Sequence, residues 1–97
     1  MDRFILSKRA RKDLLDIGDY TVDKWSEQQA ETYVRMLLEE CSTLSLKPLL
    51  GRSYDLYRPG LRGYPCGRHV IFYRILSRDK VRIVRILHER MDFPRHL

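Results

Sequence analysis

The chain has 97 residues, 43% of them hydrophobic, and a formal net charge of +6. This length suits a single domain over residues 1–97, because domains typically contain about 100–150 residues. It contains no run of about 18 apolar residues and no apolar signal-peptide core near Met1, so the sequence argues against a membrane or secreted protein and favours a cytoplasmic one.

A short strand over residues 3–7 is the first element that the sequence predicts. Ser7 is a good N-cap for a helix starting at Lys8, because its hydroxyl can accept a hydrogen bond from a free amide in the first turn. One stripe of this helix contains Ala10, Leu14, Ile17, Thr21 and Trp25. We expect this stripe, including Trp25, to be buried.

A second helix is predicted to begin after Ser26, which forms a capping box with Gln29. Its apolar stripe contains Ala30, Tyr33, Leu37, Cys41 and Leu44. The helix should end before Pro48, because proline disfavours helical geometry in the residue before it. Two helices with so short a connection form a helical hairpin.

The second half of the chain predicts turns followed by strands. Proline and glycine punctuate residues 48–67 and leave room for one short strand near Leu61–Tyr64. Val70–Leu76 and Val81–Leu87 are rich in β-branched and aromatic residues, and residues 77–80 between them read as a hairpin loop. The tail from His88 to Leu97 is polar. The order β-α-α-β-β-β predicts an α+β domain with a helical hairpin on one face of a small, mostly antiparallel sheet.

Strand alternation divides the hairpin into two faces if its loop has two or four residues. The first face then holds Ile71, Tyr73, Ile75, Val84 and Ile86, with His69, Arg82 and His88 at its ends. The second holds Val70, Phe72, Leu76, Val81, Ile83 and Leu87, with Arg68, Arg74 and Arg85 among them. We expect the helices to cover the first face, because an unpaired buried arginine costs several kcal/mol.

The second face is then expected to be a half-open apolar surface that carries guanidinium groups. Such a surface suits a partner with apolar side chains and carboxylates, or phosphates. The alternative is that each arginine packs its stem along the sheet and holds its head in water.

Charge is distributed unevenly along the chain. Residues 1–47 carry eight Lys or Arg and nine Asp or Glu, whereas residues 48–97 carry eleven and four. The whole excess therefore lies in the second half, which favours an anionic partner, either nucleic acid or an acidic protein segment.

Few residues suggest catalysis or metal binding. His69 and His88 are predicted cross-strand neighbours, but no third ligand accompanies them, and Cys41 and Cys66 are expected to be free thiols. His88, Glu89 and Arg90 are the residue types of a metal-free nuclease, yet neighbours in a strand point to opposite faces. We therefore predict no catalytic residue, no metal and no cofactor.

Four stretches of the sequence together resemble a known family. They are "SKRARKDLLDI" after the first strand, "RPGLRGYPCGRHVIFYRI", "VRIVRILHERMD" and the terminal "PRHL". As a set they are similar to the ParE branch of the RelE/ParE toxins of bacterial type II toxin–antitoxin systems, and the resemblance covers nearly the whole chain.

The resemblance implies the same β-α-α-β-β-β fold and two protein partners. One is a ParD-like antitoxin, whose acidic, amphipathic C-terminal segment wraps the helical hairpin and sheet of the toxin in a hetero-oligomer. The other is DNA gyrase, which ParE-like toxins stall on cleaved DNA. The resemblance implies that the toxin is not itself an enzyme and that it contacts DNA only through the gyrase complex. The candidate residues for binding gyrase or antitoxin are Arg58, Arg62, Arg68, Arg74, Arg85, His88 and Arg90.

The RelE branch supplies an alternative, a ribosome-dependent mRNA endonuclease. RelE toxins use basic residues on the concave face of the sheet and catalytic groups near the C-terminus. This sequence has arginines on the corresponding strands, but its loop over residues 48–60 offers only Arg52 and Arg58 in place of a lysine-rich segment.

Overall fold

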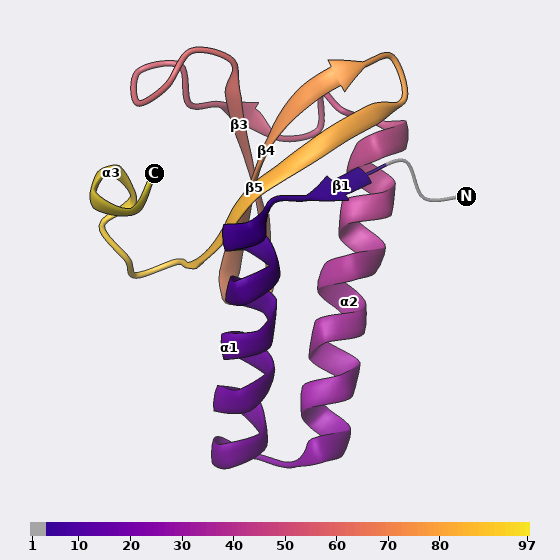
Figure 1. The fold of residues 1–97 in the computed structure, drawn as a ribbon, viewed down its shortest axis with the longest axis vertical. Coiled ribbons are helices and arrows are strands. Elements are labelled where there is room, and N and C mark those ends of the chain that lie inside the picture. Colours follow the sequence, from indigo (N-terminus) through magenta and orange to yellow (C-terminus); the bar gives the residue numbers. More distant parts are fainter. Residues whose placement is uncertain (1–3) are drawn as a thin grey trace.

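The computed structural model describes residues 4–97, in which a helical hairpin packs on one face of a five-stranded sheet (Figure 1). The elements are β1 (Phe4–Leu6), α1 (Lys8–Lys24), α2 (Glu27–Leu46), β2 (Arg52–Ser53), β3 (Leu61–Cys66), β4 (His69–Ser77), β5 (Lys80–His88) and α3 (Phe93–His96). The predicted first strand also included Arg3, which lies outside the described residues.

The strands are ordered β1-β5-β4-β3-β2 across the sheet. β1 runs parallel to β5, and the other three pairs are antiparallel. This arrangement confirms the predicted α+β fold. Two short elements, β2 and α3, lie in segments that the sequence analysis had assigned to turns and to a polar tail.

Both helix N-caps form as predicted. The Ser7 hydroxyl accepts a hydrogen bond from the Ala10 amide at 3.0 Å, and the Ser26 hydroxyl accepts one from the Gln29 amide at 3.0 Å. Ser7 also donates to the Val84 carbonyl at 2.8 Å, which ties the start of α1 to β5.

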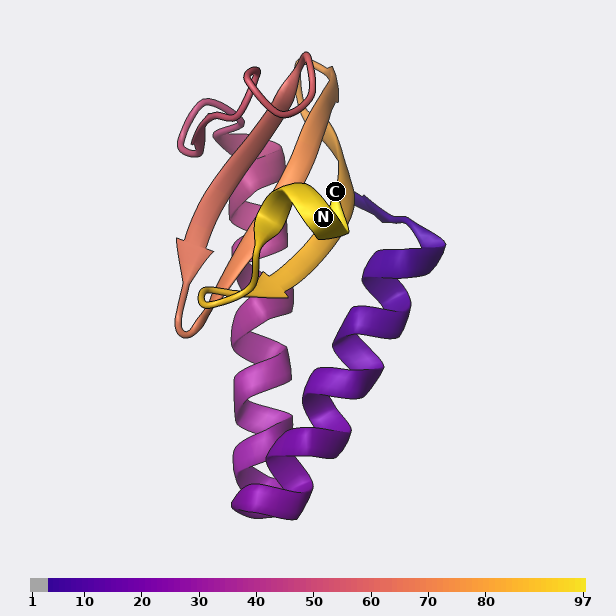
Figure 2. The same ribbon diagram turned by 90° about the vertical axis from the view of Figure 1, so that its left-hand side faces the viewer.

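The helical hairpin extends past the sheet, so that the α1–α2 connection lies far from the strands (Figures 1 and 2). Trp25 at this end has 71% of its surface exposed, and the prediction that it is buried was wrong. Trp25 is the C-cap that follows the last residue of α1, and no strand reaches this end of the hairpin.

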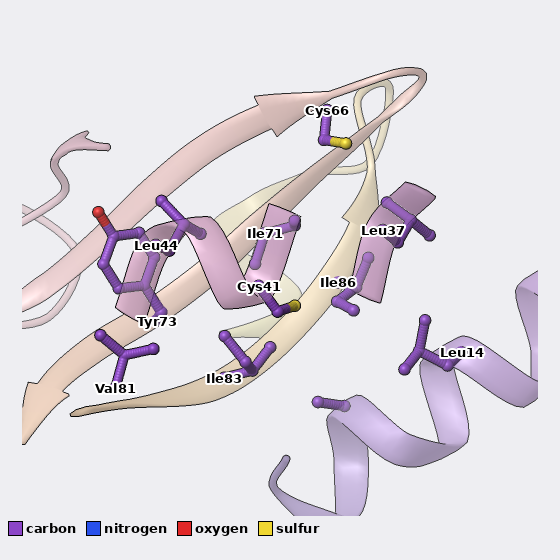
Figure 3. Packing of buried hydrophobic residues seen from close by; sticks show 11 residues of the cluster. Leu14, Leu37, Cys41, Leu44, Cys66, Ile71, Tyr73, Val81, Ile83 and Ile86 are labelled. Carbon is purple, nitrogen blue, oxygen red and sulfur yellow. The ribbon is translucent and has the colours of Figure 1, made fainter. Parts of the chain in front are cut away.

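The main core lies between the hairpin and what we call the helix face of the sheet. It contains Ala10, Leu14, Leu37, Cys41, Leu44, Cys66, Ile71, Tyr73, Val81, Ile83 and Ile86 (Figure 3). The buried Tyr73 hydroxyl donates to the Pro48 carbonyl at 2.6 Å and accepts from the Gly51 amide at 2.9 Å. These two bonds fix the loop after α2 against the sheet.

A β-bulge in β5 changes which residues share a face. Phe72 pairs with Arg85 while the next residue, Tyr73, pairs with Ile83, so Val84 is the extra residue. Val81 and Ile83 consequently join the helix-face core, and Val84 packs on the opposite side. The predicted faces were wrong for these residues and for Arg82, because the prediction assumed unbroken alternation.

The opposite side of the sheet, here called the far face, has a core of its own. Tyr54, Leu61, Val70, Phe72, Leu87 and Leu97 form a buried cluster, with Phe93 and Val84 packed against it. Phe72 is fully buried and Leu87 is 1% exposed, so the expectation of a half-open apolar surface was wrong. The Tyr54 loop and α3 cover it; α3 lies in front of the sheet and α2 behind it in Figure 2.

Among the helices of residues 4–97, none combines the length and the apolar character needed to cross a bilayer.

Alanine variants of Trp25 and Leu37 compare the contributions to stability of the exposed end of the hairpin and of its buried part. We expect Trp25→Ala to change the free energy of unfolding by less than about 0.5 kcal/mol, because the side chain is largely in water. Leu37→Ala should cost about 2–5 kcal/mol, because Leu37 is fully buried between α2 and the sheet. Urea titrations would measure both values, and similar costs for the two variants would contradict the structure.

Candidate functional site

A buried ion pair joins α1, β5 and α3. Arg85 Nε and Nη2 donate to the two carboxylate oxygens of Asp13 at 2.8 and 2.9 Å, and each of the two side chains is 12% exposed. The same carboxylate accepts from the Ile86 amide at 2.9 Å, and Arg85 Nη1 donates to the His96 carbonyl at 2.8 Å. The hydrogen bond with Asp13 raises the pKa of Arg85, so the guanidinium stays charged. Arg85 therefore binds its own chain.

Two further arginines hold the last residues of α3. Arg9 of α1 donates to the His96 carbonyl at 3.3 Å, and Arg58 donates to the Leu97 carbonyl. Carbonyls at a helix C-terminus have no partner within the helix and carry partial negative charge, which favours cations there. With Arg85, these residues fasten α3 over the far-face cluster.

Arg62 and Arg74 support the loops beside the sheet. Arg62 Nε donates to the Gly51 carbonyl at 3.0 Å, and Arg74 Nη1 donates to the Pro59 carbonyl. A guanidinium group has five N–H donors. Neither residue uses all of its donors in these bonds, so both retain capacity for an external ligand.

Arg68, His88 and Arg90 are brought together at the opposite end of the strands. The Glu89 amide donates to the Arg68 carbonyl at 2.9 Å, which places the end of β5 beside the β3–β4 turn. Arg68 forms an exposed ion pair with Glu89 at 3.3 Å, and the Arg90 amide donates to His88 Nδ1 at 3.2 Å. The Arg68 and Arg90 side chains are exposed here, on segments that these backbone hydrogen bonds bring together.

His69 and His88 are cross-strand partners, as predicted, with ring centroids 5.3 Å apart. Tyr33 of α2 lies within hydrogen-bond distance of His69 Nδ1, at 2.7 Å, and its hydroxyl accepts from the Arg68 amide at 2.9 Å. The direction of the Tyr33–His69 hydrogen bond depends on which ring nitrogen of His69 carries the proton. Burial, assisted by His88, lowers the pKa of His69 from 6.5 to about 4. The histidine pair thus connects α2 to the sheet.

The outer surface of the helical hairpin contains an apolar groove of about 660 Å³ between α1 and α2. Its floor and walls include Leu14, Leu15, Val22, Val34 and Leu38, and its charged rim includes Arg11, Asp19, Glu31 and Arg35. The exposed fractions are 64% for Leu15 and 40% for Val22. This groove was not predicted from the sequence. Its signal there is the pair Leu15 and Val22, which lie seven residues apart in α1 and off the buried stripe.

The seven candidate residues therefore divide into three groups. Arg58 and Arg85 hold α3, Arg62 and Arg74 hold loops, and Arg68, His88 and Arg90 lie together at the β3–β4 turn. Asp13, which the sequence analysis did not select, organises the first group. Whether each residue also binds a partner stays a prediction.

Comparison with known proteins identifies the family. The family model described as the ParE toxin of the type II toxin–antitoxin system parDE matches residues 4–93. This chain belongs to the ParE toxin family. It is 40% identical over 95 residues to Toxin ParE1 of Mycobacterium tuberculosis. This alignment covers 98% of this chain and 97% of the relative.

Other ParE proteins extend this relationship. Toxin ParE1 of Caulobacter vibrioides is 37% identical over 97 residues, covering 100% of this chain and 99% of the relative. Toxin ParE of Escherichia coli is 30% identical over 97 residues, with coverages of 100% and 94%. The solved chromosomal ParDE toxin–antitoxin system from P. aeruginosa contains a chain that superposes with a TM-score of 0.73 at 22% identity, covering 91% of this chain and 96% of that one. That structure supports the ParE fold.

Breaking the buried pair of this ParE chain should cost far more than breaking an exposed one. We expect Arg85→Ala or Asp13→Ala to lower the free energy of unfolding by about 2–3 kcal/mol, because each leaves a largely buried charge without its partner. The matched control is Lys12→Ala, which removes the exposed Lys12–Asp16 pair and should cost at most about 1 kcal/mol. Denaturant titration measures all three; equal costs would show that Asp13–Arg85 is no anchor.

Stability should fall in mild acid because of His69. The unfolded chain binds a proton at this side chain below pH 6.5, whereas the folded chain does so only near pH 4. Stability is therefore lost as the pH falls from 6.5 towards 4, by about 1–2 kcal/mol for a half-buried ring.

The test compares wild type with His69→Gln between pH 7 and pH 4.5. The variant should show the smaller loss of unfolding free energy, and the difference between the two proteins removes the contribution of titrating carboxylates. Parallel pH profiles would contradict this assignment.

Proposed function

We propose that this ParE-family chain inhibits DNA gyrase in the cytoplasm by stabilising the complex of gyrase with cleaved DNA, and that a ParD-like antitoxin neutralises it. The observation that carries the proposal is the family match over residues 4–93, together with 40% identity along almost the whole of a ParE1 toxin. Inhibition then proceeds by protein–protein contact, and the chain itself catalyses no reaction.

The groove between α1 and α2 supports the antitoxin part of the proposal. An amphipathic segment could place apolar side chains on Leu15, Val22 and Val34 and pair its carboxylates with Arg11 and Arg35 at the rim. Burial of exposed apolar side chains favours association by about 25 cal/mol per Å². The acidic, amphipathic C-terminal segment expected of a ParD-like antitoxin has this chemistry.

The cluster of Arg68, His88 and Arg90 supports a separate contact with gyrase. These side chains are not needed to hold α3 or the loops, in contrast to Arg58, Arg62 and Arg85. They sit on the turn that joins β3 to β4 and on the segment after β5, and none of them lines the groove between α1 and α2. We propose that this cluster contacts the target.

Expression of the chain in bacteria without an antitoxin tests the proposal. We expect filamentous cells, an SOS response and covalent gyrase–DNA adducts, all reversed by co-expression of the antitoxin. Arg90→Ala should reduce the adducts at least about tenfold, because it removes an exposed cation from the proposed contact, while Lys12→Ala on the outside of α1 should leave them unchanged.

Two outcomes would contradict the proposal. Translation arrest with codon-position cleavage of mRNA would indicate the RelE-like activity, and normal growth at a high level of folded protein would exclude both toxic mechanisms. Equal adduct levels for wild type and Arg90→Ala would remove this residue from the contact without affecting the gyrase assignment.

A further inference from the structure

Two arginines oppose each other directly on the far face. Arg74 of β4 pairs with Arg82 of β5 in the strand register. Their neighbours Tyr73, Ile75, Val81 and Ile83 lie on the helix face or pair along it, so alternation places Arg74 and Arg82 on the far face. Like charges directly opposite each other destabilise a sheet. This pair therefore costs stability unless an anion binds it.

The described chain supplies little negative charge to compensate. β3, β4 and β5 contain no aspartate or glutamate. Within residues 4–97, the Arg82 side chain has no hydrogen bond or ion pair, and the Arg74 guanidinium donates to the Pro59 carbonyl. The nearest acids in sequence are Asp79 in the hairpin turn, which has an interaction of its own, and Glu89, which pairs with Arg68. Asp55, in the loop that contains Pro59, accepts from the Gly60 amide at 2.8 Å.

The surroundings favour phosphate over an apolar peptide or an unstacked base. The apolar residues of the far face are already covered, with Phe72 fully buried and Tyr54 only 8% exposed. Single-stranded nucleic acids bind by stacking successive bases on accessible aromatic rings. The aromatic residues of the strands here, Phe72 and Tyr73, are fully buried, and the exposed ring beside them, Tyr57, belongs to the loop before β3. What remains accessible is a group of cations on rigid strands, and guanidinium groups bind phosphate oxygens in bidentate geometry.

We propose that Arg74 and Arg82 bind the phosphodiester backbone of duplex DNA. The choice of DNA rests on the proposed function, because gyrase inhibited on cleaved DNA would present a duplex to the inhibitor. The proposal goes beyond the expectation that the toxin meets DNA only through gyrase. The far face lies opposite the helical hairpin, so an antitoxin in the α1–α2 groove would leave these cations accessible.

Fluorescence anisotropy with a labelled duplex of about 25 base pairs tests this site in the absence of gyrase. We expect the double variant Arg74→Gln/Arg82→Gln to bind at least about tenfold more weakly than wild type in 50 mM salt. The slope of log K against log salt should fall in magnitude by about 2, because each lost phosphate contact contributes about 0.9.

The matched control is Lys12→Gln/Lys24→Gln, which removes the same charge from α1 and should change affinity less than twofold. Thermal melting verifies that each variant is folded. If loss of the Arg74–Pro59 bond unfolds the double variant, Arg82→Gln alone should still reduce the slope by about 1. An equal loss of affinity in the control would show that only net charge matters and would overturn the proposal.

The nucleic-acid probe also distinguishes the outcomes. Tighter binding to a duplex RNA or to single-stranded DNA of the same sequence would overturn the DNA assignment. Gyrase poisoning by wild type with unchanged DNA affinity of the double variant would refute this site and leave the proposed function standing. The expected DNA-binding pattern without any gyrase poisoning would refute the proposed function and leave this site standing.

Discussion

The ion pair between Asp13 and Arg85 is the constraint on which the two-sided architecture depends. β1 pairs only with Val81–Ile83 of β5, so the edge of β5 beyond that point has no neighbouring strand. There the Asp13 carboxylate accepts a hydrogen bond from the Ile86 amide. Through Arg85 Nη1 the same pair reaches the His96 carbonyl. One carboxylate on α1 thus positions the helical hairpin on one face of the sheet and α3 on the other.

This arrangement explains why a basic chain of 97 residues has so many arginines in and beside its strands. Arg9, Arg58 and Arg85 converge on the two carbonyls at the end of α3. A four-residue helix buries little surface and could not remain on the sheet by its own propensity. Guanidinium groups, with several donors on one rigid plane, can hold such a segment while their charges remain partly solvated. Much of the arginine content is therefore structural.

The remaining charge and apolar surface lie on different parts of the molecule. The helical hairpin offers an apolar groove with a mixed rim, the β3–β4 turn offers Arg68 and Arg90, and the far face offers Arg74 and Arg82. If the proposed function holds, this separation lets an antitoxin and the target bind different side chains of the same chain.

The sequence by itself determined the local elements: the Ser7 and Ser26 caps, both helices, the β4–β5 hairpin and the cross-strand histidines follow from capping, period and β-propensity. The motifs also indicated the ParE family, which the comparisons confirmed. Only the tertiary structure decided which face of the sheet each strand residue lies on and which helix residues are buried. The bulge at Val84 moves Arg82 to the far face, and the end of the hairpin leaves Trp25 in water. Asp13 meets Arg85 across 72 residues, a contact no local pattern encodes, because long-range pairing is selected by the packing of the whole fold.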